Sequence, residues 1–380
     1  MKRVASVDVL RALTMLMMLW VNDFAGVSGL PHWLHHAGMK EDMMGFSDLV
    51  FPGFLFCVGL SLPLAIENRF SKGDSILKVF SHIISRSFAL IVMGIFSMNC
   101  SGIEGGLNGQ WFGIIMVVAY FLIWDTYPKA EGWKKNLFTV LRVLGALILI
   151  GLLAYRVAMG RPIRTGWWGI LGLIGWAYLI CALAYLLVRK NFFGNIAVWA
   201  VITGFMIAQA SGISQLGFYP GGWTHPTLVF SGALITMFMN RFASDKSPLP
   251  LAGVLLSCAL LMFAAGRLCH NFWICSKIMA TPTWAFLSIA CFLPVLTILY
   301  LICDFKGWTA WAKPIRPAGT ATLTCYVLPT IWYGVKQLAE INTPAVLHNG
   351  LPGLARSMVF AFVIVAIGGL LSKIHIKLKI

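Results

Sequence analysis

The feature that most constrains this chain is a recurrence, from one end to the other, of apolar segments about 20 residues long. Each is long enough to cross the hydrocarbon core of a bilayer as a helix. Of the 380 residues, 59% are hydrophobic and only 11% are charged, whereas about 25% are charged in a water-soluble domain. Transmembrane β-strands would be about half as long and would alternate in polarity. We therefore expect an all-α, polytopic bundle of membrane helices.

Twelve segments fit this description, and the stretches between them are short. The fourth, seventh and eighth are short themselves, so ten or eleven spans remain an alternative. No stretch is large enough for a separate soluble domain, and residues 1–380 are predicted to form a single transmembrane domain. The predicted spans are 10–30, 49–67, 78–98, 110–126, 137–159, 167–188, 194–211, 226–242, 250–268, 284–303, 317–338 and 354–373.

The placement of positive charge predicts the orientation. If the N-terminus is inside, only eight of the 29 Lys and Arg residues fall in outer segments, which leaves 21 inside. Such a cytoplasmic excess is the rule in membrane proteins, so both termini are predicted to be cytoplasmic. The same bias accounts for the formal net charge of +16 without a nucleic-acid partner. The eight outer residues are Lys40, Arg156, Arg161, Arg164, Arg267, Lys277, Lys336 and Arg356.

Titratable groups gather in the outer segment between the first two spans. Residues 31–37 hold His32, His35 and His36, and the segment continues to Asp48. Imidazoles beside carboxylates suit proton transfer near neutral pH, and a solvated loop with ordinary surface histidines is the alternative. The spacing places the three histidines on one helical face. A zinc site would need a carboxylate or Cys as well, and we expect no metal.

Two more outer residues are candidates. Asn22 ends the first span, where an amide suits an oxyanion or a substrate carbonyl. A hydrogen bond to a neighbouring helix is the alternative. His225 lies in the turn 220–226, whose Pro and Gly residues predict a loop or a broken helix entry. We count His225 among the candidate substrate-binding residues.

On the inner side, cations lie near the ends of several spans. Asp8 and Arg11 are three residues apart at the start of the first span and are expected to pair with each other. Arg86 begins the third span, and Lys313 and Arg316 precede the eleventh. Such cations suit the phosphates of a cytoplasmic nucleotide. Anchoring to lipid headgroups explains them equally well.

Six stretches share the motifs of one family of membrane enzymes. They are Ser6–Ala12, Val21–Asn22, His36–Ala37, Ser47–Gly59, Arg86–Leu90 and Asp304–Gly319. Together they resemble the heparan-α-glucosaminide N-acetyltransferase family, including its short bacterial relatives without a luminal domain. The resemblance is strongest over residues 6–90 and weaker over 300–335.

This resemblance implies transfer of an acetyl group from cytoplasmic acetyl-CoA to the amine of a terminal glucosamine across the membrane. It also implies that His36 is the catalytic histidine, with Asn22 and Asp48 at matching motif positions. The chain departs from the family pattern in three places. Two extra residues separate His36 from the block that begins at Asp48, the family's R-I-P-G-V-L-Q-R stretch is replaced around residues 110–114, and the usual Asn is missing from residues 319–321.

We therefore hypothesise a transmembrane acetyltransferase in which His36 acts as general base or acetyl carrier. Its expected partners are acetyl-CoA, an amino sugar or glycosaminoglycan fragment, and the lipid bilayer. A secondary transporter of a sugar or other small solute is one alternative, and an O-acetyltransferase for a cell-envelope glycan is another. The absence of a luminal domain favours a bacterial inner membrane, with His36 on the periplasmic side. The oligomeric state stays open, with a homodimer among the alternatives.

Overall fold

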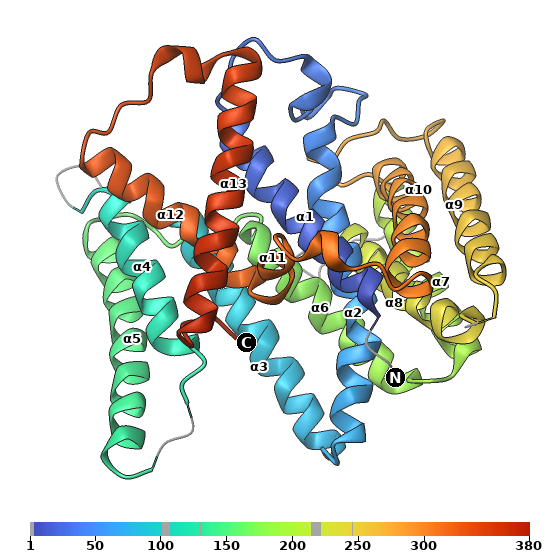
Figure 1. Cartoon of the computed structure of the whole chain (residues 1–380), viewed down its shortest axis with the longest axis horizontal. Helices are drawn as coiled ribbons and strands as arrows, with labels where there is room; N and C mark the ends of the chain where they lie inside the picture. The colour runs from blue at the N-terminus through green and yellow to red at the C-terminus, as the bar shows by residue number, and fades with distance from the viewer. Residues whose placement is uncertain (1–3, 101–106, 129–130, 214–221, 245) are drawn as a thin grey trace. The chain divides into compact units, whose positions relative to one another are not determined.

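The computed structural model describes residues 4–100, 107–128, 131–213, 222–244 and 246–380 (Figure 1). Over these ranges the regular secondary structure is helical, and β-structure is limited to isolated bridges. The α-helices are α1 (Ala5–Phe24), α2 (Phe46–Ser71), α3 (Ile76–Met98), α4 (Gly109–Trp124), α5 (Trp133–Ala158), α6 (Gly169–Val188), α7 (Phe192–Ala210), α8 (Thr224–Phe242), α9 (Leu249–Cys269), α10 (Pro282–Leu299), α11 (Arg316–Thr320), α12 (Thr322–Leu338) and α13 (Gly350–Lys373). Short helical turns are η1 (His32–Leu34), η2 (Tyr300–Phe305), η3 (Ala310–Ala312) and η4 (Ala345–His348).

Each predicted span overlaps a helix, and the eleventh is divided between α11 and α12. The first is displaced, because α1 begins at Ala5 and ends at Phe24, six residues before the predicted end. Within the described ranges, nine segments are long and apolar enough to cross a membrane. The helix α4 has 16 residues and is shorter. The helix α8 is not among the nine because it is less apolar; it buries residues 224–237 without a break. The all-α, polytopic membrane bundle is therefore confirmed.

The helices group into two compact units, each built from separate stretches of sequence. The first unit comprises residues 1–14, 30–88 and 173–313, and the second comprises 15–29, 89–172 and 314–380. The single domain over residues 1–380 stays a prediction.

The core of the first unit is the contact between α2 and α8, with α10 packed on α2 and α9. Small residues allow the two backbones to approach closely. A Cβ atom added to Gly59 would lie 1.8 Å from the carbonyl oxygen of Val229, and one added to Gly232 would lie 2.2 Å from that of Phe56. No side chain fits at either position without separating the helices.

The two ends of α2 carry different polar clusters. Asp48 lies in the first turn, and Glu67 lies 19 residues later, a rise of about 28 Å along an α-helix. At the Glu67 end, Arg189 donates to both carboxylate oxygens at 3.2 and 3.0 Å, and Lys190 lies 3.6 Å away. The first unit thus has polar clusters separated by about the thickness of a bilayer core.

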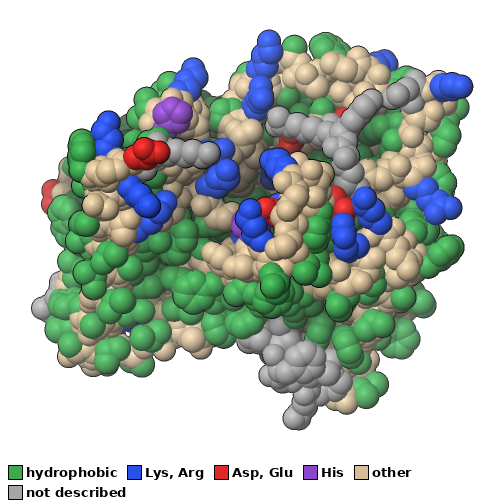
Figure 2. All heavy atoms as spheres, turned by 90° about the horizontal axis from the view of Figure 1, so that it is seen from below, with side chains coloured by type: hydrophobic (Ala, Val, Ile, Leu, Met, Phe, Trp, Pro, Cys, Tyr) green, Lys and Arg blue, Asp and Glu red, His purple; other side chains and the backbone are tan. Residues whose placement is uncertain are grey.

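In the second unit, α4 packs against α5 and α12, and α13 packs against α11 and α12. The end of the chain is tied to the end of α4, since the backbone N–H of Lys377 donates to Asp125 at 2.7 Å. The helix α5 buries only 17% of its most apolar stretch within the protein. Exposed apolar side chains along such a helix suit contact with lipid. Figure 2 shows one face of the molecule, on which Lys and Arg side chains gather in the upper part of the view and hydrophobic side chains predominate below them.

Candidate active site

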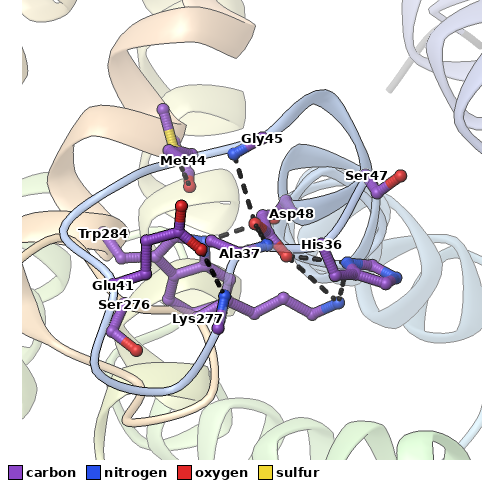
Figure 3. Close-up of polar contacts among 12 residues, drawn as sticks. His36, Ala37, Glu41, Met44, Gly45, Ser47, Asp48, Ser276, Lys277 and Trp284 are labelled. Atoms are coloured by element: carbon purple, nitrogen blue, oxygen red, sulfur yellow. Dashed lines mark hydrogen bonds and ion pairs between the residues drawn. The ribbon is translucent and has the colours of Figure 1, made fainter. Parts of the chain in front are cut away.

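The candidate active site of the first unit is built where the 30–45 segment returns to the start of α2 (Figure 3). The hydroxyl of Ser47 donates to the carbonyl oxygen of Leu34 at 2.5 Å, which folds the segment onto the helix. This return places Nδ1 of His36 2.7 Å from Oδ1 of Asp48. The prediction that the histidine and the carboxylate of this segment come together thus agrees with the geometry.

Asp48 is fixed by more than the histidine. Its Oδ2 accepts the backbone N–H of Ala37 at 2.9 Å and that of Gly45, the residue before α2, at 3.2 Å. Its side chain is 1% exposed, while that of His36 is 42% exposed. Three donors around one buried carboxylate offset the loss of water and hold it in a single orientation.

The pairing determines what His36 can do chemically. A carboxylate only accepts hydrogen bonds, so the contact with Asp48 places a ring proton on Nδ1. In the neutral form of the ring, the lone pair then lies on Nε2. With Nδ1 directed at the carboxylate, Nε2 is the nitrogen left for a substrate on the exposed side of the ring. Carboxylate–histidine pairs of this kind act as general bases in many hydrolases and transferases.

Lys277 is a third member of this site that sequence reasoning missed. It comes from the connection between α9 and α10, and its Nζ lies 3.1 Å from Nδ1 of His36 and 3.7 Å from Oδ1 of Asp48. Burial lowers the pKa of Lys277, and the charge of Asp48 acts in the opposite direction. In the sequence it was only one of the outer cations, and nothing local distinguished it from the others.

The connection that carries Lys277 is held to the 30–45 segment by hydrogen bonds and an ion pair. Asp42 lies 2.7 Å from Nε2 of His270 and accepts the backbone N–H of Cys275 at 2.8 Å. The hydroxyl of Ser276 donates to the carbonyl oxygen of Met39 at 2.9 Å. The Cys275 N–H, reinforced by His270, lowers the pKa of Asp42. These contacts fix the position of both segments around the site.

The start of α10 completes the framework. The indole of Trp284, fully buried, donates from Nε1 to the carbonyl oxygen of Asp48 at 3.2 Å. Thr281 caps α10, its hydroxyl accepting from the N–H of Trp284 at 3.4 Å. The first turns of α2 and α10 are therefore joined directly behind the carboxylate.

The other two histidines of the segment do not join this pair. His32 lies 2.5 Å from Glu41, whose pKa is lowered by the Gly38 N–H and by His32. The single helical face expected for the three histidines is wrong, because the helical turn η1 ends at Leu34 and His35 is extended. Among the described residues, no group of three His, Cys, Asp or Glu side chains suits a metal ion.

Asn22 lies in the second unit, on the last turn of α1, and is exposed. The adjacent Asp23 is engaged in its own unit, accepting from the Tyr333 hydroxyl at 2.7 Å and from Arg356 at 2.8 Å. The assignment of Asn22 to an oxyanion stays a prediction.

His225 is buried at the start of α8, where its ring packs 5.6 Å from that of Phe51. It is distinct from the histidine that contacts Asp48. Its role as a substrate-binding residue also stays a prediction.

The inner cations fall into two groups. Arg11 pairs with Asp8 at 2.7 Å, as expected, and also donates to Ser61 at 3.2 Å. Arg86 stacks over the ring of Tyr178, with 4.8 Å between the guanidinium carbon and the ring centroid. These contacts are structural in kind.

Lys313, which belongs to the first unit, and Arg316, which belongs to the second, are exposed. Either side chain is accessible to a phosphate group from the solvent. Nucleotide binding by any of the inner residues stays a prediction.

Comparison with known proteins gives two curated relatives, both heparan-α-glucosaminide N-acetyltransferases. The Mus musculus protein is 28% identical over 151 residues, which is 36% of this chain and 22% of the mouse protein. The Homo sapiens protein is 34% identical over 107 residues, which is 28% of this chain and 15% of the human protein. The chain thus spans less than a quarter of the length of either relative, and the predicted resemblance to them is confirmed.

A family model matches a longer stretch, residues 3–219, and is described as a domain of unknown function. This stretch includes the candidate residues Asn22, His36 and Asp48 but ends before Lys277. Because it covers more than half of the sequence, the chain belongs to the DUF5009 family.

Proposed function

We propose that this protein is a transmembrane acetyltransferase that moves the acetyl group of acetyl-CoA to the amine of a glucosamine-type sugar. The observation that carries the proposal is the His36–Asp48 pair, with a buried, fully engaged carboxylate and an exposed ring. The names of the two relatives supply the reaction class and the acceptor.

In the proposed reaction, the acceptor nitrogen attacks the thioester carbonyl carbon while Nε2 of His36 takes a proton from that nitrogen. The carbon–sulfur bond then breaks, and the imidazolium returns the proton to the leaving thiolate of CoA. Asp48 holds the ring and offsets its positive charge during the transfer. Asn22 is the proposed donor to the oxyanion.

The same Nε2 lone pair suits a covalent route in which His36 carries the acetyl group. In that route the ring attacks the thioester first and CoA leaves before the acceptor binds. Incubation with labelled acetyl-CoA and no acceptor separates the two routes. Label retained on the His36 peptide indicates the covalent route, and label that stays on CoA indicates direct transfer.

The charges at the two ends of α2 support a sidedness for this reaction. Lys78, Arg189 and Lys190 lie at the Glu67 end, about 28 Å from Asp48 along the helix. By the positive-inside rule we propose that this end faces the cytoplasm. His36 then faces the opposite, outer side, and in a bacterium the membrane is the inner membrane. The CoA phosphates are proposed to bind inner cations, with the exposed Lys313 and Arg316 as the first to test.

Two cysteine variants test this sidedness. Lys40 and Lys72 are both exposed and lie beyond opposite ends of α2. In sealed vesicles of known orientation, a membrane-impermeant maleimide should label K40C from the outer side only and K72C from the cytoplasmic side only, measured against wild-type labelling. The reverse pattern contradicts the orientation.

The decisive experiment for the function uses sealed proteoliposomes. Labelled acetyl-CoA is supplied on the side of the Glu67 end, and glucosamine or a glucosamine-ended disaccharide on the other. Wild type should form labelled N-acetyl product, and H36A should lose on the order of 10²–10⁴-fold in rate. H35A, which alters the neighbouring ring, is the matched control and should stay within a few fold.

Equal product from H36A contradicts the role of His36. No product from wild type with any amino sugar, together with no thermal stabilisation by acetyl-CoA, contradicts the acetyltransferase itself and favours the transporter. Product formed on a sugar hydroxyl favours the O-acetyltransferase.

A further inference from the structure

One atom of the candidate site faces two groups with opposite requirements. Nδ1 of His36 lies 2.7 Å from a carboxylate oxygen of Asp48 and 3.1 Å from Nζ of Lys277. The carboxylate requires a proton on Nδ1, whereas an ammonium requires a lone pair there. A single ring nitrogen satisfies only one of them at a time.

The geometry around Asp48 decides which contact prevails. Its Oδ2 is occupied by the backbone N–H groups of Ala37 and Gly45, so Oδ1 is left for His36 and Lys277 together. With Nδ1–H donated to Oδ1, the ammonium is held against the carboxylate at 3.7 Å and lies beside the ring as a charge. His36 and Lys277 thus share one negative charge.

We propose that Lys277 is a positioning residue of this site, whose ammonium shares Asp48 with His36 and opposes protonation of the imidazole. Asp48 alone would favour the imidazolium, because an opposite charge stabilises the protonated ring. A cation at 3.1 Å opposes that effect. The catalytic consequence rests on the proposed function, since only a neutral ring accepts the proton of the attacking amine.

The backbone that carries Lys277 is held in place by contacts with the 30–45 segment. The connection between α9 and α10 is anchored at the two residues directly before Lys277: Asp42 accepts the N–H of Cys275, and Ser276 donates to the carbonyl of Met39. The Lys277 side chain is 24% exposed, so water screens the pair only in part.

The other charges around the site are engaged elsewhere. Glu41 is held by the N–H of Gly38 and by His32, and Asp42 by His270 and Cys275. Lys277 is therefore the cation in direct contact with the His36–Asp48 pair over the ranges described above. Asp48 from α2 and Lys277 from the α9–α10 connection contact the ring or its carboxylate partner. The other titratable groups on the elements packed around the site are His270 and Cys275 from the end of α9 and the following connection, and His32, His35, Glu41 and Asp42 from the segment of His36 itself.

The proposal is tested without relying on acetyl transfer. Diethyl pyrocarbonate modifies an accessible neutral imidazole and spares the imidazolium, so the pH dependence of modification reports protonation of each histidine. Modification of the His36 peptide is measured by mass spectrometry from about pH 5 to 8.5 in the purified full-length protein, with the other histidines as internal references.

K277M removes the charge, K277R keeps it, and K40M removes an exposed lysine from the same side of the site. We expect the midpoint for His36 to rise by about one pH unit in K277M, and to stay near the wild-type value in K277R and K40M. K277Q replaces K277M if the latter does not fold, as judged by its thermal transition. An unchanged or lower midpoint in a folded, charge-removed variant overturns the proposal.

Activity gives a second readout. In K277M, kcat/KM should fall about tenfold at low pH and recover as the pH rises about one unit, because only the protonation of the base is altered. A uniform loss at every pH indicates a merely structural lysine and contradicts the proposal. If wild type transfers no acetyl group but the His36 midpoint still rises in K277M, the proposed function fails while this inference stands.

Discussion

Replacing Asp48 by Asn separates the chemistry of the site from its stability. Both backbone N–H groups, from Ala37 and Gly45, donate to Oδ2, whereas His36 and Lys277 contact Oδ1. An Asn side chain can place its oxygen at the Oδ2 position and keep both backbone bonds. Its NH₂ group then faces Nδ1, which must accept the hydrogen bond, so the ring proton moves to Nε2.

The magnitudes follow from this exchange. D48N loses the charge-assisted bonds but leaves no backbone donor unpaired, so we expect a stability loss of about 1–2 kcal/mol. With the proton on Nε2, the lone pair needed by a general base is gone, and kcat/KM should fall about 10³-fold, equivalent to about 4 kcal/mol in the barrier. D48A also leaves two buried N–H groups without an acceptor and should lose about 3–5 kcal/mol of stability.

Acetyl transfer in proteoliposomes and thermal unfolding in detergent measure the two effects separately. E41Q is the matched control, because Glu41 also pairs with a histidine of this segment but holds the exposed His32. It should keep activity within about threefold. D48N activity within tenfold of wild type, with the protein folded, would refute the orientation of His36 by this carboxylate.

Three further outcomes are expected. G232A should unfold at a lower temperature than wild type, because the new Cβ atom would lie 2.2 Å from the carbonyl oxygen of Phe56. An unchanged transition temperature would contradict the close packing of α2 on α8. Burial raises the pKa of Cys275 to about 11, and only the thiolate reacts readily. Peptide mass spectrometry should therefore show Cys275 unmodified by N-ethylmaleimide near pH 7.5 and modified above about pH 10. The pKa of Asp42 is lower in the folded protein than in the unfolded chain, so its contribution to stability is present above the unfolded pKa of about 3.9 and is lost as the pH falls through the folded pKa. The transition temperature of D42N should therefore fall less steeply in acid than that of wild type. An identical acid dependence in both proteins would contradict this contribution of Asp42.

Helix placement was predictable because the bilayer imposes it locally. A spanning segment must satisfy its own backbone hydrogen bonds and present apolar side chains to lipid, so length and composition mark each helix in the sequence. The break between α11 and α12 and the burial of α8 were not predictable in this way. They depend on neighbouring helices, which local composition does not report.

Inside the candidate site, too, contacts between residues near in sequence were predictable, and the detailed backbone conformation was not. His36 and Asp48 are 12 residues apart, and a short returning segment followed by a helix start sufficed to associate them. The helical face expected for the three histidines failed because Ser47 and Asp48 draw that segment onto α2 in an extended form after Leu34. Side chains that compete for the backbone override helical spacing over so short a stretch.

The sequence alone indicates that this chain forms membrane helices and that a histidine and a carboxylate lie close together near the start of α2. The bias of its positive charges toward the cytoplasmic side stays a prediction. Lys277, 241 residues from His36, joins the His36–Asp48 pair through long-range packing. Its position depends on the packing of α10 on α2 and on the hydrogen bond between Asp42 and the α9–α10 connection. Long-range contacts of this kind leave no periodic or compositional signal, and in sequence Lys277 is indistinguishable from the exposed Lys40.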